Sequence, residues 1–283
     1  MMINPDFGTL YVVATPIGNL GDMVPRAVDV LQSVDLIAAE DTRHSVRLLQ
    51  HYGISTRLVA YHDFSHRHRL EGLLENLQQG LSIALISDAG TPLISDPGYE
   101  LVSSSRQQGI RVVPIPGACA LIAALSVSGL PSNQFVFEGF LAAKSVARRK
   151  QLSAFVREHR TVIFYESPHR IMDTLVDMEG VLGVDRPVVL ARELTKTYET
   201  IISGSVEEVI TQLRLDANQQ KGEFVVLLKG APQRGEAEVS EATEQLMRVL
   251  MEELPLKQAS SIAAKVTGLK KRELYQWGLE QSG

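Results

Sequence analysis

One segment of twelve residues, Ser87 to Gly98, constrains the fold of this chain more than any other. The apolar run Ile83-Ala84-Leu85-Ile86 leads directly into it and predicts a buried strand. The segment contains two glycines, two prolines and two aspartates, and it cannot continue as regular structure because proline removes a backbone donor and glycine admits positive φ. We expect a rigid polar loop at the carboxyl end of a buried strand, where open α/β sheets bind ligands. The alternative is an ordinary connection in which Pro97 opens the next helix.

Three similar loops accompany this one in the first half of the chain. The four loops follow four expected strands, are rich in Gly, Pro and small polar residues, and comprise residues 16–22, 39–44, 87–92 and 114–120. Strands and helices alternate five times, and the near-continuous apolar strands predict a mostly parallel sheet covered on both faces. In such a sheet all four loops emerge at one edge and converge on one site. The first loop lacks both G-x-G-x-x-G and G-K-[ST], so a dinucleotide or Walker-type site is not expected.

Composition limits the class of protein. Apolar residues make up 45% of the 283 residues and charged residues 22%, which is typical of a globular protein. The single cysteine excludes an internal disulfide framework and a Cys-rich zinc site. The net charge of −5 disfavours a protein that coats nucleic acid by bulk charge, although a local basic patch remains compatible with it. Without a spanning apolar run or a signal-peptide pattern, we expect a cytoplasmic protein with no membrane partner.

Three domains are expected. The segment Gly129 to Asn133 interrupts the strand–helix alternation, which predicts an α/β domain over residues 1–129 and a second over 130–232. Two strands near residues 188–195 and 199–203 of the second domain are candidates for a hairpin. Residues 233–283 change in composition and predict a small helical appendage with several basic residues.

Several residues in or near the loops could carry chemistry. Glu40, Asp41 and Asp88 could bind a metal or act in acid–base catalysis. We expect Asp41 to cap the helix that follows it. For Glu40 and Asp88 the sequence does not decide between a catalytic role and local hydrogen bonding. Cys119 is expected to be a packed small residue rather than a nucleophile. The helix that follows Pro116-Gly117 offers free amides to a carboxylate or phosphate.

Seven motifs together resemble a known family. In chain order they are ATPIGNLGD, AEDTRH, SDAGTPLISDPG, PIPGACA, FYESPHR, LARELTKTYE and KGEFVVLLKG. They are similar to those of the bacterial ribosomal RNA small-subunit 2′-O-methyltransferases of the tetrapyrrole methylase superfamily. The resemblance covers roughly residues 8–230 and continues into the tail. It implies two α/β/α domains with a ligand cleft between them, the tetrapyrrole methylase fold, followed by a small C-terminal helical segment.

The resemblance also implies a cofactor, a substrate and an assembly. These are S-adenosyl-L-methionine, the ribose 2′-hydroxyl of a cytidine in the decoding region of 16S rRNA within the small ribosomal subunit, and a homodimer. Mapped by motif, the expected cofactor-binding residues are Ile17, Gly18, Asp88, Thr91, Ile94, Ala118, Cys119, Tyr165, Leu194 and Val226.

A ribose hydroxyl is a poor nucleophile, so a base or a charge-stabilising group should lie beside it. The carboxylates expected on the rim of the cleft are Glu40, Asp88 and Glu166, and the base is not assigned among them. The residues expected to contact RNA are Arg43, Lys144, Arg148, Arg149, His169, Arg170, Lys270, Lys271 and Arg272, together with the basic run at residues 66–69. Each such run is more often a solvated face, so only its location beside the cleft would favour RNA contact.

Three other functions remain to be weighed. A methyltransferase of the same fold could act on a small molecule such as a tetrapyrrole. A metal-dependent phosphohydrolase would need Glu40, Asp41, Asp88 and Asp96 to converge on one ion, and we expect no metal site. A non-catalytic assembly factor would bind RNA without transferring a methyl group.

Overall fold

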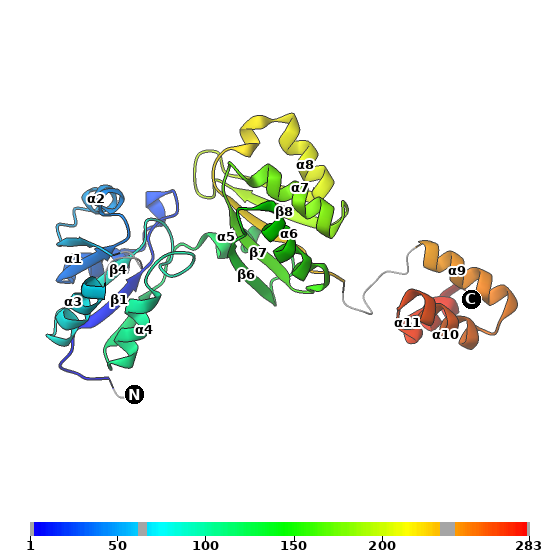
Figure 1. Ribbon diagram of the computed structural model, residues 1–283, viewed down its shortest axis with the longest axis horizontal. Helices are drawn as coiled ribbons and strands as arrows, with labels where there is room; N and C mark the ends of the chain where they lie inside the picture. Colours follow the sequence, from blue (N-terminus) through cyan, green and yellow to red (C-terminus); the bar gives the residue numbers. More distant parts are fainter. Residues whose placement is uncertain (1–2, 62–66, 233–240, 282–283) are drawn as a thin grey trace. The chain divides into compact units, whose positions relative to one another are not determined.

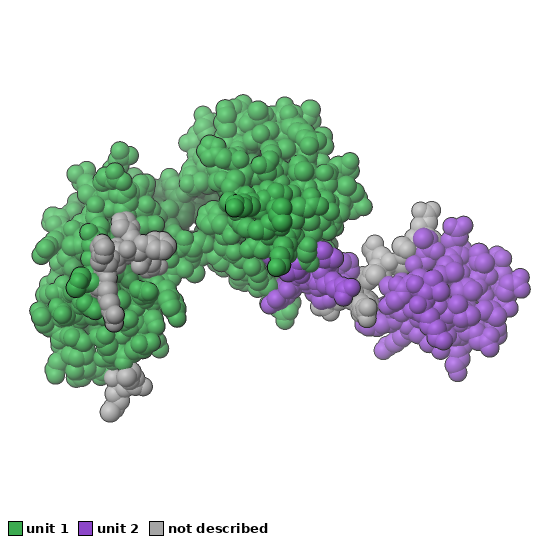
Figure 2. Space-filling model, viewed as in Figure 1, with its two compact units in different colours: residues 1–153, 161–229 green, residues 154–160, 230–283 purple. Residues whose placement is uncertain are grey.

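The computed structural model describes residues 3–61, 67–232 and 241–281. The chain divides into two compact units, one of residues 1–153 and 161–229 and the other of residues 154–160 and 230–283, which are coloured separately in Figure 2. The first unit contains both sheets, and the second contains the C-terminal helices. Each unit is described by itself.

The first sheet contains five parallel strands in the order β3-β2-β4-β1-β5. The strands are β1 (Thr9–Val13), β2 (Leu36–Ala39), β3 (Leu58–Ala60), β4 (Ile83–Ile86) and β5 (Arg111–Ile115). Every residue of β2 and β4 is buried, as expected for strands covered on both faces. The predicted parallel sheet is confirmed, and β4 ends where the segment beginning at Ser87 starts.

Two apolar cores lie on opposite faces of this sheet. Figure 1 shows the sheet with the helices that pack on it. Its helices are η1 (Leu20–Asp22), α1 (Pro25–Ser33), α2 (Thr42–His51), α3 (Arg67–Gln78) and α4 (Tyr99–Gln107). Leu31 of α1 and Leu49 of α2 pack in the core that contains Ile37, whereas Leu77 of α3 and Leu101 of α4 pack in the other. Neighbouring strand residues divide between the two cores because successive side chains of a strand point to opposite faces.

The second sheet is mixed, with the order β6-β7-β10-β8-β9. Its strands are β6 (Phe135–Phe140), β7 (Thr161–Glu166), β8 (Pro187–Arg192), β9 (Thr200–Ser205) and β10 (Phe224–Leu228). Only the β6–β7 pair is parallel, and β8 and β9 form the predicted antiparallel pair. The accompanying helices of this unit are α6 (Ser145–Ala154), α7 (Ile171–Leu182), α8 (Val206–Leu215) and η3 (Ala217–Gln220), whereas η2 (Phe155–Arg157) belongs to the second unit. A capping box between Ser205 and Glu208 fixes the start of α8.

Helix α5 (Ala120–Val127) packs against the second sheet. Its Leu121 and Leu125 share a core with Ile163 of β7 and Val225 of β10. The contact therefore crosses the boundary that we expected after residue 129. On the same helix, Ile122 is 50% exposed.

The C-terminal unit contains the predicted helices: α9 (Glu241–Glu253), α10 (Leu256–Thr267) and α11 (Lys271–Gln281). Met247, Ala263 and Leu274 form its small buried core, one residue from each helix. Within the described ranges, every helix is too short or too polar to cross a membrane.

Candidate functional site

The segment after β4 forms hydrogen bonds with each of the other three loops at the carboxyl edge of the first sheet. Thr15 and Gly90 exchange two backbone hydrogen bonds, with N···O distances of 2.9 and 3.1 Å. The Thr91 hydroxyl donates to the carbonyl of Ala118 at 3.0 Å, and the amide of Asp41 donates to the Asp88 carboxylate at 3.0 Å. The loops after β1, β2 and β5 are thus each hydrogen-bonded to the loop after β4, which confirms their predicted convergence.

This segment holds its backbone in a strained conformation. Leu93 and Ser95 have φ values of 74° and 66°, a region that residues other than glycine seldom occupy. Gly98, with φ 130°, ends the segment, and a Cβ there would lie 2.8 Å from Cδ2 of Leu85. Such strain persists only where the surrounding structure enforces it, and it is concentrated at functional sites.

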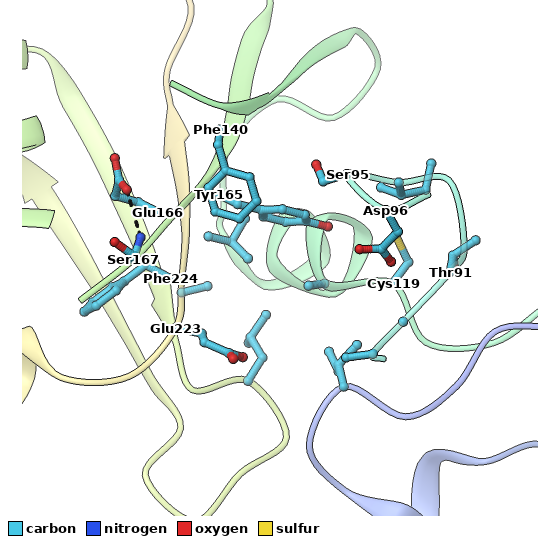
Figure 3. A pocket seen from close by; sticks show the side chains of 18 of the residues that line it. Thr91, Ser95, Asp96, Cys119, Phe140, Tyr165, Glu166, Ser167, Glu223 and Phe224 are labelled. Carbon is cyan, nitrogen blue, oxygen red and sulfur yellow. Dashed lines mark hydrogen bonds between the residues drawn. The ribbon is translucent and has the colours of Figure 1, made fainter. Parts of the chain in front are cut away.

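A cavity of about 440 Å³ opens beside this segment (Figure 3). Strand residues of the second sheet line it, together with residues of the loops that follow strands of both sheets and of the start of α5, all within the first unit. They are Ile17, Ala89, Gly90, Thr91, Ile94, Ser95, Asp96, Cys119, Ala120, Phe140, Tyr165, Glu166, Ser167, Pro168, Ala191, Leu194, Glu223, Phe224 and Val225. This volume and the mixture of apolar and polar groups are typical of a site for a small organic molecule.

Aromatic rings form one wall of the cavity. The ring of Tyr165 packs edge-to-face with Phe137 at 4.9 Å and with Phe140 at 5.6 Å between centroids. Phe140 is 53% exposed, so its ring remains available to a ligand. Burial raises the pKa of Tyr165, and the nearby Cys119 and Asp96 raise it further, so the phenol stays protonated and can donate a hydrogen bond.

Asp96 faces the same cavity, and its side chain points toward the hydroxyl of Tyr165 in Figure 3. Burial raises its pKa to about 6, and the negative charges of Glu40 and Asp88 add to the increase, whereas a hydrogen bond from Ser87 opposes it. We did not select Asp96 from the sequence as a residue of the methyl-transfer site. The one feature of the sequence that could have identified Asp96 is its position within the segment from Ser87 to Gly98, on which the loops converge.

Glu166 was a predicted catalytic carboxylate, but its acceptor oxygens are already occupied. It accepts hydrogen bonds from the amide of Ser167 at 2.8 Å, from the Thr174 hydroxyl at 2.7 Å and from Arg170 at 3.2 Å. Its side chain has no exposed surface. This carboxylate holds the start of α7 to the end of β7, and the structure argues against it as a base.

A second strained segment follows β8. Glu193 and Thr195 have φ values of 51° and 66°. Lys196 binds the carboxylates of Glu193 and Glu223, each at 2.9 Å. A Cβ on Gly18 would lie 2.5 Å from Cγ of Lys196, so glycine permits the close approach of the loop after β1 to this segment.

Six of the ten predicted cofactor-binding residues line the cavity, namely Ile17, Thr91, Ile94, Cys119, Tyr165 and Leu194. Gly18, Asp88 and Ala118 do not line it; they hold its loops together through the contacts described above. The structure corrects Val226, which is fully buried opposite Phe164. Its neighbour Val225 lines the cavity instead, because adjacent strand residues face opposite sides of the sheet.

Two other candidates near the loops have local roles. Asp41 is the predicted cap of α2, since its carboxylate accepts from the amide of Arg43 at 2.8 Å. The Asp88 carboxylate accepts its hydrogen bond from the amide of Asp41, in the loop after β2, and not from its own turn. Among residues 3–61, 67–232 and 241–281, no three His, Cys, Asp or Glu side chains are arranged to hold a metal ion. This arrangement gives no support to the phosphohydrolase alternative, which needed Glu40, Asp41, Asp88 and Asp96 on one ion.

The predicted RNA-binding residues differ widely in exposure. The exposed ones are Arg43, Lys144, Arg149, His169, Lys270, Lys271 and Arg272, as well as His68 and Arg69. Residues 62–66, including His62 and His66, lie outside the described residues, as does the side chain of Arg67.

The structure corrects the prediction for Arg148, which is buried. The Arg148 side chain is 3% exposed, and its Nη2 lies 2.7 Å from Asp177. The guanidinium of Arg170 is also bound within the protein, because it donates to the carbonyls of Leu141 and Ala142 and to Glu166. The buried guanidinium of Arg148 cannot reach a phosphate outside the protein, whereas the side chain of Arg170 is 26% exposed.

Comparisons with known proteins identify the family of this chain. The tetrapyrrole (corrin/porphyrin) methylase family matches residues 9–210, and the RsmI C-terminal HTH domain matches residues 237–282. The chain therefore belongs to the tetrapyrrole methylases. Within them it belongs to the family of ribosomal RNA small subunit methyltransferase I. The protein of that name from Vibrio cholerae is 55% identical over 97% of this chain and 95% of its own length, and the one from Synechocystis sp. is 50% identical over 96% and 98%.

Solved structures share the fold at low sequence identity. A cobalt precorrin-4 methyltransferase of cobalamin biosynthesis matches with a TM-score of 0.59 at 15% identity, over 78% of this chain and 94% of that one. A putative diphthine synthase from Entamoeba histolytica matches with a TM-score of 0.56 at 17% identity, over 80% and 93%. The predicted tetrapyrrole methylase fold is confirmed.

Proposed function

We propose that this protein transfers the methyl group of S-adenosyl-L-methionine to the ribose 2′-hydroxyl of a cytidine in the decoding region of 16S rRNA. The observation that carries the proposal is identity of 50–55% along nearly the whole chain to proteins named ribosomal RNA small subunit methyltransferase I. The methylated atom and nucleotide are inferred from the motifs that resemble those of 2′-O-methyltransferases. The substrate on this proposal is the RNA within the small ribosomal subunit.

The residues of the cavity fit the proposed cofactor. S-adenosylmethionine carries a planar base, an amino-acid carboxylate and a methyl group on a positively charged sulfur, which makes that methyl reactive. The Phe140 and Tyr165 rings offer faces on which a planar base can stack. Helix α5 begins after Cys119 without a side-chain cap, and backbone amides at such a helix start can bind a carboxylate. Gly90 has φ 83° and a Cβ there would lie 3.2 Å from Ile17, so the loop presents bare backbone to the ligand.

The protein's part in this chemistry is mostly to position the reactants. Orientation of two reacting groups can lower a barrier by roughly 7–11 kcal/mol. The hydrogen bonds among Thr15, Gly90, Thr91 and Ala118 hold the loops in one arrangement before any ligand binds. Such a preformed site spends little binding energy on ordering its own backbone.

RNA contact is proposed for the exposed basic residues alone. On the first unit these are Arg43, Lys144, Arg149 and His169. On the second unit Lys270, Lys271 and Arg272 lie at the start of α11, within the stretch that matches an HTH domain. Phosphate contacts of this kind supply affinity that falls with increasing salt.

A homodimer and a cytoplasmic location complete the proposal. The homodimer rests on the resemblance, and a cytoplasmic location suits a protein of an rRNA-modifying family because it gives direct access to bacterial ribosomal subunits. Sedimentation of the purified protein should give the mass of two chains, and the mass of one chain would contradict the proposed dimer.

Calorimetric titration with S-adenosylmethionine tests the cofactor. Binding at one site per chain, unchanged by a chelator of divalent metals, is the expected result. Heat that appears only when a divalent metal is added would contradict it and favour the carboxylate residues as a metal site. A small-molecule methyltransferase of this fold would also bind the cofactor, but it would transfer no methyl group to small ribosomal subunits.

A further inference from the structure

The C-terminal unit divides its charges between its helices. Helix α9 contains four glutamates and one arginine, whereas residues 255–272, which form α10 and the start of α11, contain five Lys or Arg and no Asp or Glu. The chain as a whole carries a net charge of −5, so this basic segment departs from the average composition. Cations gathered on one part of a small unit are typical of a surface that binds an anionic polymer.

Helix α11 has one exposed face that is basic and aromatic. On its buried side lie Leu274 and Gly278, and Gly278 is so close to Leu256 of α10 that a Cβ would overlap it. The exposed residues follow the spacing i, i+1, i+4, i+5 and i+8, which places them on one side of the helix. They are Lys271, Arg272, Tyr275, Gln276 and Leu279.

Two cations of this face have no acidic partner. Lys270, just before the helix, lies 3.6 Å from the carboxylate of Glu273, but in the described part of the chain no acidic group pairs with Lys271 or Arg272. Both lie in the first turn of α11, where the positive end of the helix dipole disfavours cations. The stability of the helix therefore does not explain these two residues, whereas a bound anion does.

We propose that the exposed face of α11 binds unpaired nucleotides of the ribosomal RNA. Lys271 and Arg272 bind phosphates, and the ring of Tyr275, a residue that is 38% exposed, stacks on a base. Aromatic rings beside cations bind single strands in this way, because every base has a face on which a ring can stack. The inference rests on the proposed function and names the form of RNA that the C-terminal unit recognises.

The geometry of paired RNA excludes the alternative of a double helix. Residues 268–270 join α10 to α11 in a short turn, with Gly268 at φ 76°, and the stretch matches an HTH domain. In DNA complexes the second helix of such a motif enters the major groove, which is about 12 Å wide. The major groove of an RNA duplex is too narrow for side chains to read. Unpaired nucleotides offer phosphates and base faces together, so they suit both the cations and Tyr275.

Fluorescence anisotropy of the full-length protein tests this surface. The probe is a labelled single-stranded RNA of about twelve nucleotides, compared with the same sequence as an RNA duplex and as a DNA duplex. We expect the single strand to bind about tenfold more tightly than either duplex. Tyr275→Ala should weaken its binding by about five- to hundredfold, the range for the loss of one base stacked on a ring, and Tyr275→Phe should stay within about twofold of the wild type.

The cations have a separate readout and a matched control. Lys271→Ala and Arg272→Ala should each weaken binding and reduce the slope of log affinity against log salt by about 0.7. Arg248→Ala on α9 should keep the wild-type affinity, because Arg248 pairs with Glu244 of its own helix at 3.3 Å. Trp277, the one tryptophan of the chain, packs in the core of this unit, so its fluorescence shows whether a variant keeps that core.

Each result decides the proposal. Duplex RNA or duplex DNA bound as tightly as the single strand would overturn it, and so would wild-type affinity in Tyr275→Ala or equal losses in Tyr275→Ala and Tyr275→Phe. If Tyr275→Ala altered the fluorescence of Trp277, the salt slopes of Lys271→Ala and Arg272→Ala would decide, and wild-type slopes in both would overturn the proposal. These measurements need no cofactor. A wild type that binds the single strand as expected but methylates no small ribosomal subunit would contradict the proposed function alone.

Discussion

Asp177 supports a buried ion pair whose loss should destabilise the first unit severely. Its carboxylate accepts from Nε of Arg148 and from Oγ of Ser145, both at 2.8 Å, and Nη2 of Arg148 lies 2.7 Å away. The Arg148 side chain is 3% exposed and that of Asp177 is 8% exposed. Asp177→Ala would leave the guanidinium of Arg148 buried without its counter-charge.

The expected cost follows from this burial. Removing one member of a buried pair typically costs about 3–5 kcal/mol. In a unit of this size each kcal/mol lowers the melting temperature by about 2–4 °C, so the shift should be roughly 6–20 °C. Arg149 provides a control, since its side chain is 49% exposed and Nη1 lies 3.8 Å from Asp177. Such a surface pair contributes about 0–1 kcal/mol, so Arg149→Ala should be nearly neutral for stability.

Urea and thermal unfolding measure these effects. The double variant Arg148→Met with Asp177→Leu removes both charges and should recover most of the stability lost in Asp177→Ala. A cost below about 1 kcal/mol for Asp177→Ala would refute the reasoning. The double variant should also keep its affinity for ribosomal subunits, because Arg148 is buried, and a tenfold loss of that affinity would restore Arg148 as an RNA contact.

Three further predictions concern the loops, the cavity and the tail. Gly98→Ala places a Cβ 2.8 Å from Leu85 on a residue with φ 130°, and it should lower the free energy of unfolding by about 1–3 kcal/mol. Urea unfolding measures this loss, and an unchanged midpoint would contradict the claim that this position requires glycine. Tyr165→Ala should weaken binding of S-adenosylmethionine at least tenfold by calorimetry, with Tyr165→Phe close to wild type, and equal effects of the two would exclude stacking on the ring. Deletion of residues 233–283 should weaken RNA methylation while cofactor affinity stays intact, and full RNA activity would remove the tail from the mechanism.

The strands and loops of the first sheet could be predicted because each is specified by residues that are adjacent in the sequence. Buried strands such as β4 appear as uninterrupted apolar runs, and the loop that begins at Ser87 follows from its Gly and Pro residues. Asp41 was recognised as a cap because capping depends on a residue and the helix directly after it. The convergence of the loops then follows from the parallel direction of the strands.

Other features depend on contacts between distant residues and could not be predicted in this way. β10 is the central strand of the second sheet although it is the last of them in the chain, and no local pattern specifies this order. Arg148 looks like its exposed neighbours in sequence, and its burial depends on Asp177, which lies on another helix. Asp96 acquires its raised pKa from burial and from Glu40 and Asp88, which only the folded loops bring near it.

The most direct test of the proposed function is the position of the transferred methyl group. Small ribosomal subunits that lack the modification are incubated with the protein and S-adenosylmethionine whose methyl group carries deuterium, and the RNA is then digested to nucleosides for mass spectrometry. We predict labelled 2′-O-methylcytidine, derived from the decoding region. Label on a base, on another nucleoside or on no RNA at all would contradict the proposed function.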